Sequence, residues 1–282
     1  MIDLHTHSIV SDGSDTPARV VELAVEAGCS ALALTDHDSL AGIDPARRRA
    51  VELGIAFVPG CEVSCRSIGP GGMHVLVYFV EEDGGPLDAE LGRLREDRRR
   101  RNLALADRLV ALGLPVTYDQ VVAVAGGEEG IGRPHFAIAL LQAGAVDSVD
   151  TAFHRYLADG RPGFVPKSRL TGVEVAALAA ASGGVAVLAH PFSTGLEGAE
   201  LARAVGGLAE VGFSGIEAIY GRYSPRRRRE LVHLARRFDL VATGGSDHHG
   251  ALKPDLRVGT GRGDLKVANQ VLVELEARRP GG

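Results

Sequence analysis

The sequence predicts an α/β barrel that is interrupted by one helical insertion. Short apolar runs of strand length alternate with amphipathic stretches of helix length near both ends of the chain, which is typical of parallel βα units. After Glu82 this alternation stops and a long charged stretch begins. The length of 282 residues suits one barrel of ~250 residues that carries an insertion.

Each barrel element is predicted from its own pattern. Thr16 places a capping hydroxyl just before Pro17 at the first helical position, and Gly28 is expected to cap the end of the same helix. The expected strands are 2–4, 31–34, 55–58, 75–80, 185–189, 215–219 and 240–243. The expected helices are 17–28, 40–53, 171–181, 198–211, 225–238 and a closing helix near 265–278.

The insertion is predicted from the middle of the chain. Residues 87–112 have the pattern of a long, charged, amphipathic helix, and further helical stretches follow through Tyr156. We therefore expect a discontinuous barrel domain of residues 1–85 and 165–282 and a helical insertion domain of residues 86–164.

The composition favours a soluble globular protein. The longest apolar runs, 75–80 and 185–189, are far shorter than the ~20 residues that cross a bilayer. The chain also begins without a basic and then apolar signal segment, so we expect a cytoplasmic protein that does not bind membranes. Cys29, Cys61 and Cys65 cannot all pair with one another and are expected to be reduced and buried.

The charge distribution argues against non-specific binding of duplex DNA. The formal charge is −5, whereas such proteins are normally basic. The absence of tryptophan also disfavours a broad base-stacking surface. Two arginine runs, 98–101 and 226–229, lie in helix-like stretches with acidic neighbours, which favours solvated helix faces over a phosphate-binding track.

Residues that can bind metal gather at the ends of the predicted strands. They are His5 and His7 after the first strand, His37 after the second, Glu62 after the third, His190 after the fifth, and Asp247 with His249 after the last. His74 differs slightly because it opens its strand. A single histidine is more often structural, but catalytic residues of α/β barrels collect at the C-terminal rim. The shared placement of six of the ten histidines therefore indicates a metal site.

The types of ligand indicate transition metals. Imidazole and carboxylate together suit Mn, Fe or Zn, whereas Mg or Ca sites are dominated by oxygen. His5 and His7 are two residues apart, so both rings point to the same side of an extended segment, and Asp247 with His249 repeats this geometry. Each pair can hold one ion.

Taken in order along the chain, these motifs resemble those of the polymerase-and-histidinol-phosphatase (PHP) family. The motifs are His5-Thr6-His7, Asp12-Gly13, Thr35-Asp36-His37-Asp38, Gly60-x-Glu62, His74-x-Leu76, Ala189-His190-Pro191 and Gly245-Ser246-Asp247-His248-His249-Gly250. The resemblance covers nearly the whole chain. It implies a distorted (β/α)7 barrel that binds up to three divalent ions, with Mn²⁺ expected first and Fe²⁺ or Zn²⁺ as alternatives.

The resemblance also implies the ligand sets. The first ion would be held by His5, His7, Glu62 and Asp247, the second by Glu62, His74 and His190, and the third by Asp12, His37 and His249. Asp36 and Asp38, which flank His37, are expected to orient ligand imidazoles. Glu217 is expected to line the barrel, and His248 to lie in a loop, where S-D-F-H is the more usual sequence.

The insertion resembles the branch of the family that acts on nucleoside 3′,5′-bisphosphates and on short 5′-phosphorylated RNA. The resemblance depends on Gly132-Arg133-Pro134-His135-Phe136 and Gly163-Phe164-Val165-Pro166-Lys167, although relatives often carry histidine at the lysine. Arg133 and Lys167 would steady a phosphate, with Arg222 as a further cation. His135 would bind phosphate or protonate the leaving oxygen. The insertion is expected to act as a lid that selects substrate.

The predicted site suits hydrolysis of phosphate esters. Three divalent ions carry about +6, three ligating carboxylates return about −3, and the surplus of about +3 should bind an anion. A metal-activated hydroxide is then the expected nucleophile, with Asp247 and His135 as the catalytic residues of this chain. The alternatives are a histidinol-phosphate-type phosphatase of small metabolites, a non-catalytic metal-binding PHP domain, and a metal-dependent amide hydrolase. The sequence leaves the oligomeric state open.

Overall fold

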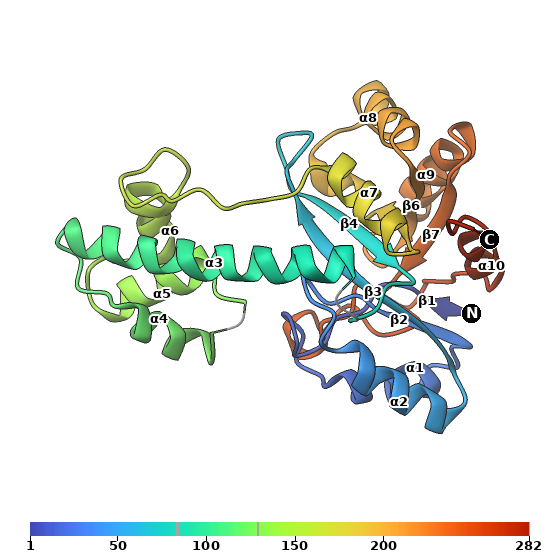
Figure 1. Cartoon of the computed structure of the whole chain (residues 1–282), viewed down its shortest axis with the longest axis horizontal. Helices are drawn as coiled ribbons and strands as arrows, with labels where there is room; N and C mark the ends of the chain where they lie inside the picture. Colours follow the sequence, from blue (N-terminus) through green and yellow to red (C-terminus); the bar gives the residue numbers. More distant parts are fainter. Residues whose placement is uncertain (83–84, 129, 282) are drawn as a thin grey trace. The chain divides into compact units, whose positions relative to one another are not determined.

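A computed structural model describes residues 1–82, 85–128 and 130–281 of the chain. The chain divides into two compact units. The first comprises residues 1–91 and 169–282, and the second comprises residues 92–168. Both chain ends lie in the first unit (Figure 1).

The first unit is built on one sheet of seven strands. In sheet order, which is also chain order, these are β1 (Ile2–Asp3), β2 (Ala31–Leu34), β3 (Ala56–Cys65), β4 (Met73–Tyr78), β5 (Val185–Leu188), β6 (Phe213–Tyr220) and β7 (Val241–Gly245). The sheet curls into a nearly closed barrel, because the segment after β1 bonds to the segment at the end of β7. His7 N donates to His248 O at 2.9 Å, and Asp247 N donates to His5 O at 2.8 Å. The predicted barrel of seven strands is confirmed.

Strand β4 corrects the expectation of parallel units throughout. It runs antiparallel to both β3 and β5, while the other neighbouring pairs of strands are parallel. Only residues 66–72 join β3 to β4, and a parallel pair needs a crossover of a dozen residues or more. The start of β4 therefore lies at the same rim as the C-terminal ends of the parallel strands.

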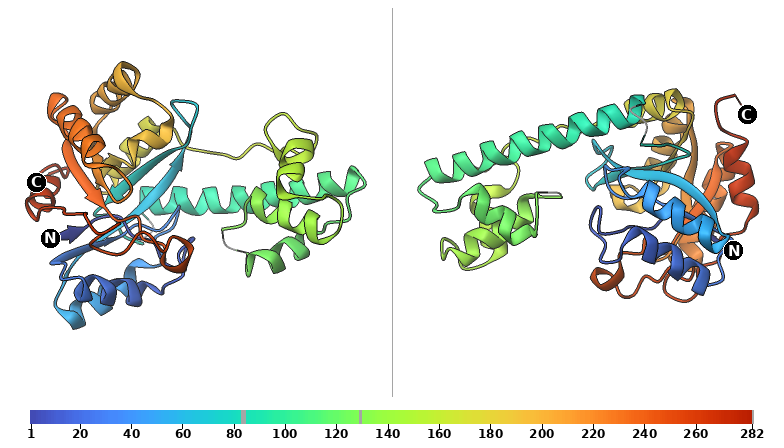
Figure 2. Two further views of the ribbon diagram at one scale, coloured as in Figure 1. Left: turned by 180° about the vertical axis from the view of Figure 1, so that it is seen from behind. Right: turned by 60° about the horizontal axis from the view of Figure 1, so that its bottom comes forward.

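Helices cover the outside of this sheet (Figure 1). They are α1 (Pro17–Glu26), α2 (Ile43–Leu53), α7 (Gly172–Ala181), α8 (Gly198–Glu210), α9 (Pro225–Arg237) and α10 (Gln270–Glu276), with short 3₁₀ turns at Pro191–Thr194 and Gly250–Leu252. As predicted, Thr16 caps α1, since its hydroxyl accepts from Arg19 N at 3.2 Å and Pro17 occupies the first turn. Helices α1 and α2 lie side by side (Figure 2). The closing helix, α10, is shorter than the predicted 265–278.

Two buried clusters stabilise the first unit. One joins α1 and α2 to β2 through Val20, Leu32 and Leu34. The other gathers side chains of several strands and of α10, among them Leu76 and Val187. Burial of each such side chain contributes about 1.5–3 kcal/mol relative to exposure. These strands therefore form a rigid base for the loops that follow them.

The second unit is helical. It contains most of α3 (Pro86–Ala111), together with α4 (Tyr118–Ala125), α5 (Arg133–Gln142), α6 (Val149–Ala152) and a π-helical turn at Phe153–Leu157. Its own core includes Leu105, Phe136 and Leu140. Thr117 and Gln120 form a reciprocal cap at the start of α4. Within the described part of the chain, none of the helices is long and apolar enough to cross a membrane.

The three cysteines lie inside the first unit and are expected to resist alkylation. Cys29, Cys61 and Cys65 are free and buried, as predicted, and burial raises the pKa of the Cys29 thiol to about 11. Since the thiolate is the reactive form, iodoacetamide should modify none of them in the folded protein. It should modify all three after unfolding in guanidinium, as counted by intact mass. Rapid labelling of the folded protein would contradict their burial.

Candidate metal centre

Nine predicted ligands lie together at one rim of the barrel. Loops after β1, β2, β5 and β7 bring His5, His7, Asp12, His37, His190, Asp247 and His249, and β3 and β4 bring Glu62 and His74. Glu62 lies within β3, because this strand extends seven residues beyond its predicted end at Val58. His74 reaches the same rim because β4 is antiparallel.

The deepest group consists of His5, His7, Glu62 and Asp247. All four are buried, and their ligand atoms lie within 4.8 Å of one another. Nε2 of His5 lies 3.1 Å from Nε2 of His7, and each lies 3.2 Å from Oε2 of Glu62. Oδ1 of Asp247 lies 3.4 Å from Nε2 of His7. These are the four residues that were expected to hold the first ion.

A second group lies nearer to solvent. It joins His7, Asp12, His37 and His249. Nε2 of His249 lies 3.2 Å from Oδ1 of Asp12, and Nε2 of His37 lies 3.7 Å from Oδ2 of the same carboxylate. The Asp12 side chain is 52% exposed, so this end of the cluster is open to incoming ligands. The group contains the predicted set of Asp12, His37 and His249 and adds His7.

The third group is arranged around Glu62. Its members are His37, Glu62 and His74, whereas the prediction combined Glu62 and His74 with His190. Oε1 of Glu62 lies 3.0 Å from Nδ1 of His74 and 2.8 Å from Nε2 of His190, while Oε2 lies 3.2 Å from Nδ1 of His37. The two oxygens of one carboxylate thus face different sets of rings.

Two ring nitrogens show that the cluster fits metal ions. Nδ1 of His37 and Nε2 of His249 are buried and form no hydrogen bond within residues 1–82, 85–128 and 130–281, although each lies 3.2 Å from a carboxylate oxygen. Such unpaired groups cost free energy. Ligands of one ion point their lone pairs at a common centre and not at each other, which gives short distances without hydrogen-bond alignment. The imidazole and carboxylate donors suit divalent transition metals.

The electrostatics of the cluster favour cations. Burial alone would lower the pKa of His7, but hydrogen bonds to Asp247 and Glu62 raise it to about 9. Burial would raise the pKa of Glu62, but the charges of His37 and His5 hold it well below its usual range. The pKa of Asp247 is also held well below its usual range, by its hydrogen bond to His7 and the charge of His5, against the effect of burial. Both carboxylates therefore stay ionised and attract positive charge.

Glu217 is the hydrogen-bond partner of His5, a member of the deep group. It is fully buried, and its Oε1 lies 2.8 Å from Nδ1 of His5 while its Oε2 accepts from the backbone N of His190 at 2.7 Å. A proton on Nδ1 leaves the lone pair of His5 on Nε2, the atom that faces Glu62 and His7. The predicted barrel-lining carboxylate thus has a further role as the partner of His5, which was not predicted from the sequence.

Asp36 does not orient an imidazole in the way that was predicted. Its carboxylate accepts from the backbone N and hydroxyl of Ser8, both at 2.7 Å, and from the hydroxyl of Ser11 at 2.6 Å. It therefore holds the loop that carries Asp12, because this loop turns back over the end of β2. His248, as predicted, is a loop histidine, and its ring bridges Leu256 O and Asp15 at 2.9 Å each.

Two further groups at Asp247 were missed from the sequence. Its Oδ2 accepts from the Tyr220 hydroxyl at 2.8 Å and from Lys253 Nζ at 2.9 Å, which leaves Oδ1 toward His7. Burial raises the pKa of Tyr220, so the phenol remains a donor. Only their positions in the sequence could have indicated these contacts. Tyr220 is the last residue of the strand that contains Glu217, and Lys253 follows Asp247 in the same loop.

The predicted substrate-binding residues are distributed over both units. Arg222, in the first unit, lies 3.1 Å from Asp255 and is 40% exposed. In the second unit, Arg133 pairs with Asp159 at 2.6 Å and lies over Phe164, and Nδ1 of His135 accepts from Gly132 N at 3.1 Å in the first turn of α5. Lys167 is half-buried in the segment that follows. Their roles toward substrate stay predictions.

Comparison with known proteins agrees with this geometry. The PHP domain matches residues 3–124. A 5′-3′ exoribonuclease of Haemophilus influenzae is 34% identical over 88% of this chain and 89% of its own. A 3′,5′-nucleoside bisphosphate phosphatase of Chromobacterium violaceum is 33% identical over 98% of this chain and 97% of its own. A solved structure from Bifidobacterium adolescentis, described as a metal-dependent phosphoesterase, is 30% identical, with a TM-score of 0.76 over 99% of this chain and 96% of its own. This chain therefore belongs to the PHP family and is a metal-dependent hydrolase of phosphoric esters.

Proposed function

We propose that this protein removes phosphate from nucleotides, either a nucleoside 3′,5′-bisphosphate or a short RNA with a 5′-phosphate, at a centre of three divalent ions. The observation that carries the proposal is that three ligand groups are contiguous. His7 belongs to two of them, His37 to two, and Glu62 to two. Neighbouring ligand groups would hold their ions close enough together for one phosphoryl group to contact more than one of them.

The ligand residues would hold different ions according to how deeply they are buried. His5, His7, Glu62 and Asp247 would hold the inner ion, Asp12, His37 and His249 the outer one, and Glu62, His74 and His190 the third, so that Glu62 would bridge two ions. Bound ions of this kind neutralise the phosphoryl oxygens and acidify a water from pKa ~15.7 to about 7. Asp12 and His74 are exposed enough to face the incoming ester. Glu217 and Lys253 hold His5 and Asp247 in place.

The second unit is proposed to select the substrate. Arg133 and His135 occupy the first turn of α5, where the free backbone N–H groups and the helix dipole favour an anion. Lys167 follows in the same unit. These groups would contact the second phosphate of a bisphosphate or the next phosphate of an RNA chain. The names of the relatives support nucleotides and RNA as the substrate class.

The proposal is tested by phosphate release from manganese-loaded protein. Adenosine 3′,5′-bisphosphate, a 5′-phosphorylated trinucleotide RNA and histidinol phosphate are compared at equal concentration. Turnover of the nucleotides that is lost in His7→Ala and kept in His154→Ala supports the proposal, because His154 is exposed in the second unit, outside the cluster. Turnover of histidinol phosphate alone would overturn the substrate class.

Metal binding should also stabilise the fold. The ligand groups come together only in the folded chain, so ions that bind them stabilise the folded state. At one hundred times Kd, a ligand of the folded state adds about 2.7 kcal/mol, which corresponds to roughly 5–10 °C in Tm for a domain of this size. Mn²⁺ should therefore raise the Tm of chelator-treated protein, and Mg²⁺ at equal concentration should raise it less. A Tm that is unaffected by Mn²⁺ would contradict the metal centre.

Arg133 should affect substrate binding more than chemistry. Its replacement by alanine removes a charged hydrogen-bond donor, which is worth about 1.5–3 kcal/mol, so KM for adenosine 3′,5′-bisphosphate should rise at least about tenfold. Turnover of 4-nitrophenyl phosphate, which has one phosphate, should change little. Arg161→Ala is the matched control, since Arg161 is an exposed arginine of the same unit. Equal effects of the two variants would remove Arg133 from the substrate site.

A further inference from the structure

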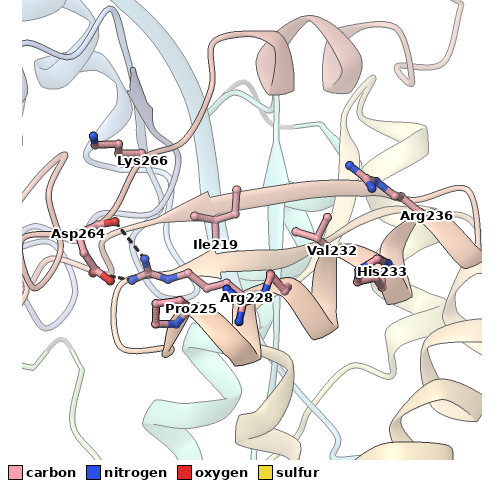
Figure 3. Close-up of a pocket in the computed structure, with 9 residues that line it drawn as sticks. Ile219, Pro225, Arg228, Val232, His233, Arg236, Asp264 and Lys266 are labelled. Carbon is pink, nitrogen blue, oxygen red and sulfur yellow. Dashed lines mark hydrogen bonds and ion pairs between the residues drawn. The ribbon is translucent and has the colours of Figure 1, made fainter.

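Helix α9 borders a groove that is separate from the metal centre. Its volume is about 620 Å³, within the ~300–1,000 Å³ typical of small-molecule sites. The lining residues are Ile219, Pro225, Arg228, Arg229, Val232, His233, Arg236, Asp264 and Lys266 (Figure 3). None of them belongs to the three ligand groups of the rim.

Basic side chains surround this groove. Arg228 is already engaged, because its guanidinium donates to the Asp264 carboxylate at 2.9 Å and to Tyr220 O at 3.2 Å. Arg229, Arg236 and Lys266 are exposed, and within the described ranges of the chain their side chains form no ion pair or hydrogen bond. The chain as a whole has a net charge of −5. Three unpartnered cations around one cavity therefore mark a local positive potential that selects an anion.

The floor of the groove is apolar. Ile219, near the end of β6, and Val232, on α9, are both half-buried, and Pro225 lies at the start of the helix. A half-buried isoleucine and valine beneath free arginines suit a ligand with a flat apolar part and an anionic part. Arginine presents a planar fork that matches two phosphate oxygens. We propose that this groove is a second nucleotide site, in which Arg229 and Arg236, which are about two turns apart on α9, bind the phosphate and the base lies on Ile219 and Val232.

The arginine run of residues 226–229 was predicted to form a solvated helix face. In the structure only two of its four arginines line the groove. Arg228 and Arg229 line the groove, whereas Arg226 and Arg227 do not. Arg227 instead pairs with Glu197 at 2.8 Å and lies over the ring of Phe192. Arg226, which is exposed, and Arg237, which stacks on Phe238, belong to the same helix. Arg226 and Arg237 are therefore matched control positions, because their replacement removes the same charge from α9 outside the groove.

The test is calorimetric titration of metal-free protein, prepared with a chelator and then dialysed. Removal of divalent ions takes the metal cations away from the rim. Arg133 and Lys167 of the second unit remain as other candidate phosphate binders, so paired variants on α9 are used to assign the binding to the groove. AMP should bind, and adenosine and ribose 5-phosphate should each bind at least tenfold more weakly. AMP binding no tighter than that of ribose 5-phosphate would overturn recognition of a nucleotide. Absence of AMP binding would overturn the site.

Paired variants assign the binding to the groove. Arg229→Ala with Arg236→Ala should weaken AMP at least tenfold, and Arg226→Ala with Arg237→Ala should change it less than twofold. Equal losses in the two pairs would show a general effect of charge and overturn the assignment. This inference goes beyond the proposed reaction, because binding is measured without metal. Its failure would leave turnover at the metal centre untouched, and a failure of turnover would leave the binding result standing.

Discussion

Replacement of Glu62 by glutamine is expected to reduce turnover of nucleotide substrates by about 10²–10³-fold or more, the range for removal of one preorganised electrostatic group. Oε2 of Glu62 faces His5, His7 and His37, and Oε1 faces His74 and His190. No other carboxylate in the three ligand groups faces as many rings. Glutamine keeps the shape but loses the charge and replaces one acceptor by a donor.

The loss of turnover in Glu62 variants should be proportional to the loss of bound metal. Glu62→Gln should bind fewer equivalents of manganese by elemental analysis, and Glu62→Asp, which keeps the charge on a shorter side chain, should retain more. Glu52→Gln is the control, since Glu52 is an exposed glutamate on α2 that is paired with Arg49. Full occupancy and turnover in Glu62→Gln would show that this carboxylate does not bridge the ions. Circular dichroism verifies that each variant is folded.

The barrel could be predicted from the sequence because its signals are local. Runs such as Ala31–Leu34 and Val185–Leu188 alternate with helices whose caps are visible in the sequence, as at Thr16. The direction of β4 could not be predicted from periodicity, because an apolar run has the same pattern in either direction. The predicted gap of residues 59–74 left room for a crossover. The short link of residues 66–72 becomes visible only because the structure extends β3 to Cys65.

The ligand residues could also be predicted, because metal-binding side chains are rare and their positions after the strands are regular. Their supports could not. Glu217 lies in an apolar strand, and its contact with His5 joins residues 212 positions apart. Tyr220 reaches Asp247 through the pairing of β6 with β7, and Lys253 reaches it through the fold of the loop after β7. Such contacts depend on tertiary geometry, whereas motif spacing reports on local geometry.

The arrangement at Glu217 leads to the second large expected effect. Its two oxygens accept from two donors, Nδ1 of His5 and the backbone N of His190, at 2.8 and 2.7 Å. In Glu217→Gln only one oxygen remains, so one donor must face an NH₂ group in either orientation of the amide. His5 would then lose its fixed tautomer, or the His190 loop would shift. Loss of such a partner typically lowers metal affinity 10–100-fold.

This effect is measured as the Kd of manganese by calorimetry, beside turnover at saturating metal. We expect Glu217→Gln to weaken manganese 10–100-fold and to regain much of its turnover at high manganese, because the side chain positions a ligand and does not itself bind the ion. Glu210→Gln, at an exposed glutamate of α8, is the matched control. If turnover in Glu217→Gln stayed low at saturating manganese, Glu217 would have a direct part in the reaction. Unchanged affinity would show that the His5 tautomer does not depend on this carboxylate.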